Sequence, residues 1–374
     1  MRLLTAAVGL VLASSLAAPI FASELGNQSA VVAHEWGTFT SVAAPDGSPV
    51  EWSTLVGPPD LPCFVQRGPA RKTDFSSLVR METPVLYFYS SRSAELSVKV
   101  PALPLGSMTE WYPKATDAGN SLRWDSIKLD PAAHPDLPAS KNASRYFAAR
   151  NTDSTPLNVG GQWEKMLFYR GVGSFAIPLY PKFTADGNIE VRNVSQDGIP
   201  LAILFENHDG KLGYRIESDM TGTSTIDLPD LTGDIGRVRA VIVKALIERG
   251  GLYPKEAQAM MDTWQDSWFE EGMRLIYVLP QRPVDALLPL TIAPVPSELT
   301  RAFVGRIELL SPAMKREIET AATAGDEVAL KKYGRFLSAF ARQMPGFAAT
   351  AAYRGVEQKL EQETGNVSPA SCVP

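Results

Sequence analysis

The chain has 374 residues and a mass of 40.6 kDa, and 45% of its residues are apolar. A composition this apolar excludes disorder as the main state of the chain. The 36 basic and 41 acidic residues give a net charge of −5, and no segment carries a dense basic stripe. This charge argues against nucleic acid or an anionic membrane surface as the main partner. The length suits two domains, or one large β-rich domain with an appendage.

The first 22 residues have the layout of a secretory signal peptide. Arg2 is followed by the apolar run Leu3–Leu12 and then by small residues. Cleavage is expected after Ala22, with Ala17 as a second site. Because no Cys lies near these positions, we do not expect a lipoprotein. No later apolar run approaches the roughly 20 residues that a membrane span needs. The sequence therefore predicts a soluble bacterial protein, periplasmic or secreted, with no membrane span in its mature form.

Cys63 and Cys372 are the only cysteines of the chain. In an exported protein two cysteines can pair, because compartments outside the cytoplasm are oxidising. The alternative is two thiols, one of them on the C-terminal tail, and the sequence leaves both alternatives open. A Cys63–Cys372 disulfide would tie this tail to the N-terminal region.

From residue 31 to about 226 the residue pattern is typical of short β-strands. Asp-Gly dipeptides at 186–187, 197–198 and 209–210 are hairpin-type turns between apolar runs, which predicts an antiparallel meander. The expected strands are 31–42, 83–89, 96–100, 166–168, 175–179, 189–194, 199–205 and 211–216. Strands of this kind indicate a β-sandwich, and we assign it to residues 23–226.

After Pro229 the pattern becomes helical. Asp234 can cap a helix that stops at Gly250, and Pro254 opens a second helix that carries Trp264 and Trp268 at helical spacing. Strands at 273–279 and 302–310 and helices from Pro312, through 333–344 and over 351–363 complete the expected elements. We therefore predict an α+β fold class, in which the N-terminal antiparallel β-sandwich packs against a mostly helical α+β region at 227–374.

Two short motifs resemble known sites and fail the test of context. Residues 34–38, His-Glu-Trp-Gly-Thr, begin like a zinc-protease helix, but that helix needs a second His where Thr38 stands. Residues 171–176 fit a loose dinucleotide pattern, but no helix can follow them, so we interpret these glycines as a tight turn. With His134 and His208 in loop and turn segments, we expect no metal site and no cofactor.

Charged residues stand inside apolar segments at four places, where burial is costly unless each charge is paired. In a helix that continues past Trp268, Glu271 would share the face of both tryptophans, whereas Glu270 would point about 100° away. Gly272 could end this helix a turn early and swing Glu271 outward. The candidate catalytic carboxylates are Glu35, Glu82 and Glu271, and the candidate binding residues are His34, Arg80, Arg170, Trp264 and Trp268.

The sequence also resembles a family of uncharacterised secreted bacterial proteins. The resemblance is carried by His-Glu-Trp-Gly-Thr-Phe-Thr at residues 34–40 and by the stretches 81–89, 168–173, 204–207, 263–272 and 303–306. It covers most of the mature chain. It implies that the chain is one integrated unit, and since the family has no established activity it transfers no catalytic residue and no cofactor.

Two hypotheses for the function stay open, and the sequence leaves it uncertain whether the protein is an enzyme. The first is a ligand-binding or scaffold protein of the cell envelope, whose partner is a small molecule, a glycan or an envelope protein. The alternative is a secreted hydrolase of glycans or esters, with carboxylate acid/base chemistry at the junction of the two regions. Carboxylates that share an open cleft would favour the hydrolase, and carboxylates held in arginine pairs would disfavour it.

Overall fold

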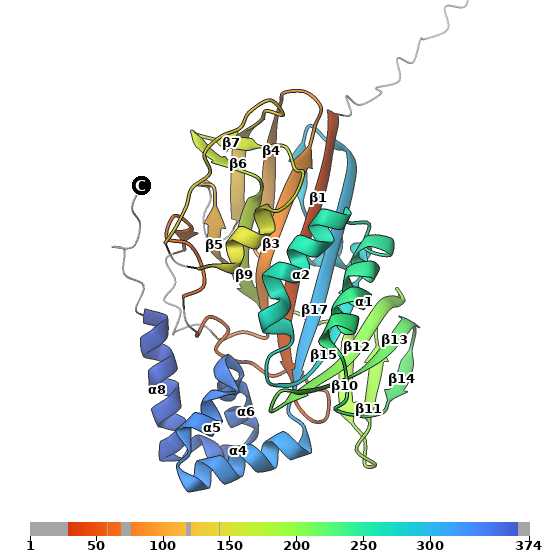
Figure 1. Cartoon of the computed structure of the whole chain (residues 1–374), viewed down its shortest axis with the longest axis vertical. Coiled ribbons are helices and arrows are strands. Elements are labelled where there is room, and N and C mark those ends of the chain that lie inside the picture. Colours follow the sequence, from red (N-terminus) through yellow and green to blue (C-terminus); the bar gives the residue numbers. More distant parts are fainter. Residues whose placement is uncertain (1–28, 58, 69–75, 117–120, 142, 366–374) are drawn as a thin grey trace, which may run out of the picture.

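The computed structural model of the chain describes residues 29–57, 59–68, 76–116, 121–141 and 143–365. The predicted signal peptide and Cys372 lie outside these residues, so the predicted cleavage and the predicted disulfide stay predictions. The fold is α+β with sandwich-like sheets, as the sequence predicts (Figure 1).

Three sheets account for the named strands of the described residues. A nine-stranded sheet has the order β13 (Lys211–Met220), β12 (Ile199–His208), β15 (Gly272–Leu279), β17 (Pro296–Leu309), β1 (Ser29–Ala43), β3 (Val79–Tyr89), β9 (Leu167–Gly173), β5 (Ser107–Tyr112) and β2 (Gln66–Arg67). A three-stranded sheet holds β10 (Leu179–Phe183), β11 (Ile189–Asn193) and β14 (Thr223–Ile226). A five-stranded sheet holds β16 (Thr291–Ala293), β4 (Ala94–Pro101), β6 (Ser121–Leu129), β7 (Leu157–Val159) and β8 (Gln162–Glu164).

The helices fall into two groups along the chain. The first comprises the 3₁₀ segment η2 (Arg145–Arg150), α1 (Ile235–Glu248), α2 (Pro254–Trp268) and α3 (Gln281–Leu287). The second comprises α4 (Pro312–Ala324), α5 (Glu327–Lys331), η3 (Gly334–Phe336), α6 (Leu337–Gln343), α7 (Pro345–Ala348) and α8 (Ala351–Gly365). Figure 1 shows α1 and α2 side by side on one face of the nine-stranded sheet, and α4, α5, α6 and α8 gathered in a separate group. Among the described residues, every helix is too short or too polar to span a lipid bilayer.

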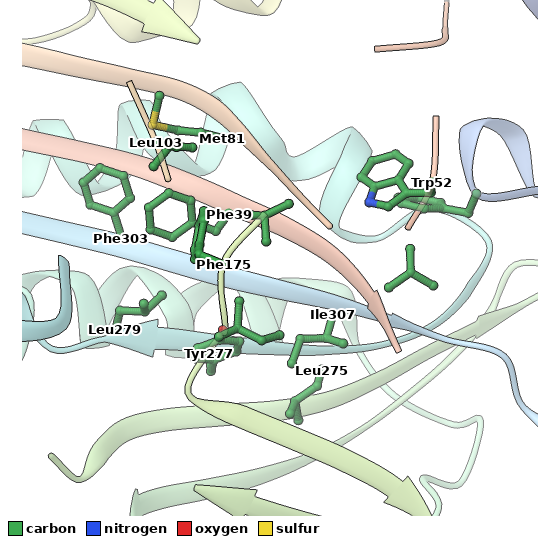
Figure 2. Packing of buried hydrophobic residues seen from close by; sticks show 14 of the residues in the cluster. Phe39, Trp52, Met81, Leu103, Phe175, Leu275, Tyr277, Leu279, Phe303 and Ile307 are labelled. Atoms are coloured by element: carbon green, nitrogen blue, oxygen red, sulfur yellow. The ribbon is translucent and has the colours of Figure 1, made fainter. Parts of the chain in front are cut away.

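The central strands of the nine-stranded sheet are buried on both faces. On one face, apolar side chains such as Trp36 and Val304 pack against α1 and α2. On the other face, Phe39 stacks on Phe303 with ring centroids 5.0 Å apart, within a core that includes residues of the two smaller sheets (Figure 2). A sheet covered on both sides gives nearly continuous buried strands, and every residue of β15 is buried. Any charge on such a strand is therefore costly unless it is paired.

The predicted helix starts and most predicted strands are confirmed, and three local interpretations are wrong. Gly171 and Gly173 lie inside β9 and form no turn; glycine stands at both positions because a side chain would press on the neighbouring chain near residues 103–107. β11 and β12 belong to different sheets, so they form no meander. The expected strand at 175–179 is absent from the described residues, since β10 begins only at Leu179.

The nine-stranded sheet takes strands from both sides of residue 226. β12 and β13 come before this residue and β15 and β17 after it, and β15 pairs with β12. Residue 226 therefore marks the change from mostly strands to mostly helices along the chain, while the large sheet continues across it.

Candidate functional site

A band of buried charged and polar side chains crosses the α2-facing side of the large sheet. Thr40 of β1 lies opposite Arg80 of β3 and Arg306 of β17, and Glu308 lies opposite Arg274 of β15. Directly opposed residues on neighbouring strands share a face. The band comprises Arg170, Arg80, Glu82, Thr38, Thr40, Arg306, Glu308 and Arg274, and all of these residues are buried.

One end of the band holds the carboxyl-terminal end of α2. Arg274 Nε donates to Glu308 Oε1 at 2.9 Å, and its Nη1 donates to the backbone oxygen of Trp268 at 3.0 Å. Arg306 donates to the same carboxylate of Glu308 and to the backbone oxygen of Ser267 at 2.6 Å. The last carbonyl groups of a helix lack partners and carry partial negative charge, so guanidinium groups stabilise this helix end.

Beside this helix end the structure has a cavity of about 200 Å³, which we call the Arg80 cleft. It lies where β3 and the end of α2 meet η3, α8 and the loop that follows β1. Its polar lining comprises Asp60, Arg80, Glu82, Arg145, Ser267, Glu270 and Arg335, and its apolar lining includes Trp264, Leu55 and Leu360. The sequence marks Arg80, Glu82 and Trp264 as candidate site residues, and the fold brings these three together.

Each carboxylate of the cleft is held by an arginine. Glu82 Oε1 lies 2.6 Å from Arg335 Nη1, and its side chain is 4% exposed. Burial raises the pKa of the Glu82 carboxyl, but the positive charges of Arg335 and then Arg80 outweigh burial and lower this pKa to about 2. Glu82 is therefore ionised at any physiological pH.

The other two carboxylates of the cleft are paired in the same way. Asp60 accepts two hydrogen bonds from Arg170, at 2.9 and 2.7 Å. Glu270 lies 2.5 Å from Arg306, and although burial raises its pKa, the charges of Arg306 and Arg335 lower it overall. Arginines thus hold both carboxylates through charge-assisted hydrogen bonds, and in Glu270 they favour the ionised form.

Arg80 differs from the arginines that hold these carboxylates. It is 7% exposed, and its Nε has no hydrogen-bond partner in the described part of the chain. Burial lowers the pKa of its guanidinium group, and the nearby Glu82 carboxylate opposes this effect only in part. Buried charged groups without hydrogen bonds are rare and call for an explanation. Arg80 is the least satisfied charge of the band.

The backbone of β3 is strained beside the cleft. Thr83 has a φ of +47°, which is unusual for a β-branched residue, and the pairing of β3 with both neighbours shifts by one residue there. Arg170 Nε and Nη2 donate to the Thr83 hydroxyl at 3.2 and 3.1 Å. Strained residues of this kind cluster at functional sites. The bulge leaves Arg80 and Glu82 on the same face as Val85, which faces α1 and α2.

Two other candidate residues serve the interior of the protein away from the cleft. Glu35 is fully buried, accepts a hydrogen bond from Arg301 Nε at 2.6 Å, and is also bonded to the Tyr169 hydroxyl. His34 Nδ1 lies 2.8 Å from Glu256 Oε2, at the first turn of α2. These contacts assign both residues to the packing of the sheet.

The expected position of Glu271 on the tryptophan face is wrong. The helix α2 ends at Trp268, because Phe269 leaves helical geometry and Arg274 binds the carbonyl groups that follow. Glu271 then lies away from the tryptophans at the β12–β13 turn, where its side chain is 15% exposed and accepts hydrogen bonds from the Asp209 backbone N–H at 3.0 and 3.2 Å. Its neighbour Glu270, expected to point about 100° away from the tryptophan face, lines the cleft with a side chain that is 40% exposed.

Trp268 is fully buried between α2 and the sheet and does not line the cleft. Arg170 supports the cleft indirectly, because it holds the lining residue Asp60. Sequence reasoning missed Asp60, Arg145 and Arg335, which come from a loop and from the two 3₁₀ helices η2 and η3. One signal was available for the strain: Pro84 interrupts a strand pattern, which is typical of a bulge.

Comparison with protein-family models and with curated proteins found no match. The resemblance carried by residues 34–40 therefore stays a prediction, and the function has to be argued from the site. Within the described residues, no group of three or more His, Cys, Asp or Glu side chains is arranged to hold a metal ion.

Proposed function

We propose that the protein is exported and acts in the periplasm or outside the cell as a soluble binding protein, which holds a small molecule or the end of a glycan in the Arg80 cleft. The observation that carries this proposal is the convergence of Arg80, Glu82 and Trp264 on one cavity. The cavity lies at the junction of a large sheet and two helical groups, a preferred place for ligand sites. Trp264 offers an aromatic wall of the kind that stacks on sugars and other rings.

The charges of the cleft favour binding over carboxylate hydrolysis. Glycoside cleavage needs one carboxylic acid that stays protonated near neutral pH, and such acids have raised pKa values. In the Arg80 cleft the pKa values of Glu82 and Glu270 are both lowered by arginines. The other two candidate carboxylates, Glu35 and Glu271, lie outside the cleft lining. The cleft thus supplies fixed charges and an aromatic wall, and neither Glu82 nor Glu270 has the raised pKa of a proton donor.

The test is a binding screen of the mature protein. Thermal-shift measurements against neutral, carboxylated, sulfated and phosphorylated glycans and small molecules should identify compounds that raise the melting temperature, and calorimetry should show saturable binding at one site. The variant Arg145→Trp serves as the control in which entry to the cleft is blocked. Arg145 lines the cleft and forms no ion pair with a described residue, so a larger side chain should fill the opening without breaking a contact. This variant should keep the fold and lose binding.

Two outcomes would contradict the proposal. Compounds that bind equally well to the wild-type protein and to Arg145→Trp would place the site elsewhere. Release of product from a bound glycan or ester, lost in Glu82→Gln or Glu270→Gln, would favour the hydrolase hypothesis, for which the shared cleft of these two carboxylates is the supporting observation.

A further inference from the structure

We infer that the ligand of the Arg80 cleft carries an anionic group, a phosphate, sulfate or carboxylate, which pairs with the Arg80 guanidinium deep in the cleft and passes Arg145 on its way in. The inference deepens the proposed function and rests on it. Its first support is Arg80 itself. This residue lines the cavity and is only 7% exposed. Its Nε has no hydrogen-bond partner in the described part of the chain.

The balance of charge around the cleft is the second support. The charged groups that line it, the described arginines that hydrogen-bond to them, and Glu308, which two of these arginines share, comprise six arginines and four carboxylates. These are Arg80, Arg145, Arg170, Arg274, Arg306 and Arg335 against Asp60, Glu82, Glu270 and Glu308. Since each carboxylate is already held by an arginine, the excess of two positive charges falls on Arg80 and Arg145. An anionic group would satisfy both.

The neutral donors around Arg80 point to the same chemistry. Trp264 lines the cleft, and its Nε1 has no hydrogen-bond partner among the described residues. Thr40 lies directly opposite Arg80 on the neighbouring strand, and its buried hydroxyl also lacks a partner there. An indole N–H can only donate, and a guanidinium can only donate, so the group that satisfies them has to be an acceptor. Oxyanions carry several acceptor oxygens on one centre.

The size of the cleft limits what can enter. A volume of about 200 Å³ equals roughly seven water molecules at about 30 Å³ each. This space admits an acidic group together with a few further atoms, and it excludes a large ligand as a whole. The cleft therefore takes a small anion, or the anionic end of a longer molecule whose remainder lies outside.

The four paired arginines serve as an internal comparison. Arg170, Arg274, Arg306 and Arg335 each bond to a carboxylate, and two of them also bond to helix carbonyl groups. These contacts are what a guanidinium with a purely structural role shows in this protein. Arg80 shares the sheet face and the burial of Arg170, Arg274 and Arg306, but its Nε has no hydrogen-bond partner among the described residues. We infer that a ligand supplies this partner.

The experiment uses the mature protein and three anions of simple chemistry. Sodium phosphate, sulfate and acetate are titrated at constant ionic strength against chloride, with thermal shift and calorimetry as readouts. We expect at least one of them to raise the melting temperature saturably, beyond the effect of chloride. The order of the three affinities distinguishes a tetrahedral phosphate or sulfate from a planar carboxylate.

Variants locate the effect. Arg80→Gln should weaken binding of that anion at least tenfold, and Arg145→Gln should weaken it severalfold. The control Arg215→Gln, on the exposed face of β13, should bind like the wild type. If Arg80→Gln fails to fold, Arg145→Gln still decides, because this side chain forms no ion pair with a described residue.

Failure of the inference can be told apart from failure of the proposed function. If no anion binds, or if binding is unchanged in Arg80→Gln and Arg145→Gln, the anionic group is wrong. The proposed function would still stand if neutral compounds bind and Arg145→Trp blocks them. If neither anions nor neutral compounds bind at the cleft, both are wrong.

Discussion

Glu82 gives the sharpest test of the charge arrangement in the cleft. Burial alone would raise the pKa of its carboxyl from the usual 4.5, but the charges of Arg335 and Arg80 lower it to about 2. Because the pKa is lower in the folded state than in the unfolded state, the ionised carboxylate stabilises the fold above pH 4.5. This stabilisation is lost as the pH falls from 4.5 towards 2.

The magnitude follows from the two pKa values. A gap from 4.5 to about 2 corresponds to about 3 kcal/mol of unfolding free energy at pH 7, and to about 1 kcal/mol at pH 3. The side chain is 4% exposed, so solvent screening takes little from these values. Urea unfolding should therefore show Glu82→Gln less stable than the wild type by about 3 kcal/mol at pH 7 and by about 1 kcal/mol at pH 3.

A matched control is Glu190→Gln on β11, where the side chain is 41% exposed and only 3.8 Å from a lysine nitrogen. This change should alter the stability by less than about 0.5 kcal/mol at both pH values. Equal losses for Glu82→Gln at pH 7 and pH 3 would show that packing, and not the carboxylate charge, sets the effect. A loss below about 0.5 kcal/mol at pH 7 would refute the ion pair with Arg335.

Three further predictions concern stability and export. Glu35→Ala should reduce the unfolding free energy by about 3–5 kcal/mol in urea melts, because it leaves Arg301 buried without its carboxylate; a smaller effect than in Glu82→Gln would contradict this assignment. Gly305→Ala would place a Cβ 2.1 Å from the ring of Tyr277, so we expect a loss of about 1–3 kcal/mol, most of which the double variant with Tyr277→Leu should recover. Mass spectrometry of protein from the native host should find a new N-terminus between residues 18 and 24, and an intact Met1 would be incompatible with export.

The local elements could be predicted because their signals are local. The carboxylate of Asp234 accepts from the Gly236 backbone N–H and starts α1, and Pro254 stands in the first turn of α2. Both are decided within one turn of helix, so a short stretch of sequence contains the whole cause. The central pair of strands has no such signal. β1 and β17 run parallel at the centre of the sheet, and only the complete fold brings them together.

The site depends on contacts between distant parts of the chain. Arg335 reaches Glu82 over a sequence separation of 253 residues, and no pattern around either residue announces the other. The helical phase of Glu271 failed for a related reason. A periodic pattern assumes that the helix continues, whereas Arg274 of the following strand binds the carbonyl groups beyond Trp268 and fixes the end of α2. The tertiary partner thus decides which of two adjacent glutamates faces the cleft.

The sequence could nevertheless identify which residues would be costly to bury, and the structure then separates two ways of meeting that requirement. A buried charge can be satisfied within the chain, as Glu35 is by Arg301. It can also be left for a ligand, as we infer for Arg80, which lies on a strand of the same sheet and is buried almost as completely. Both residues look alike in the sequence, since each interrupts an apolar strand. Only the partners of each polar atom distinguish a charge that holds the fold together from a charge that is available to bind.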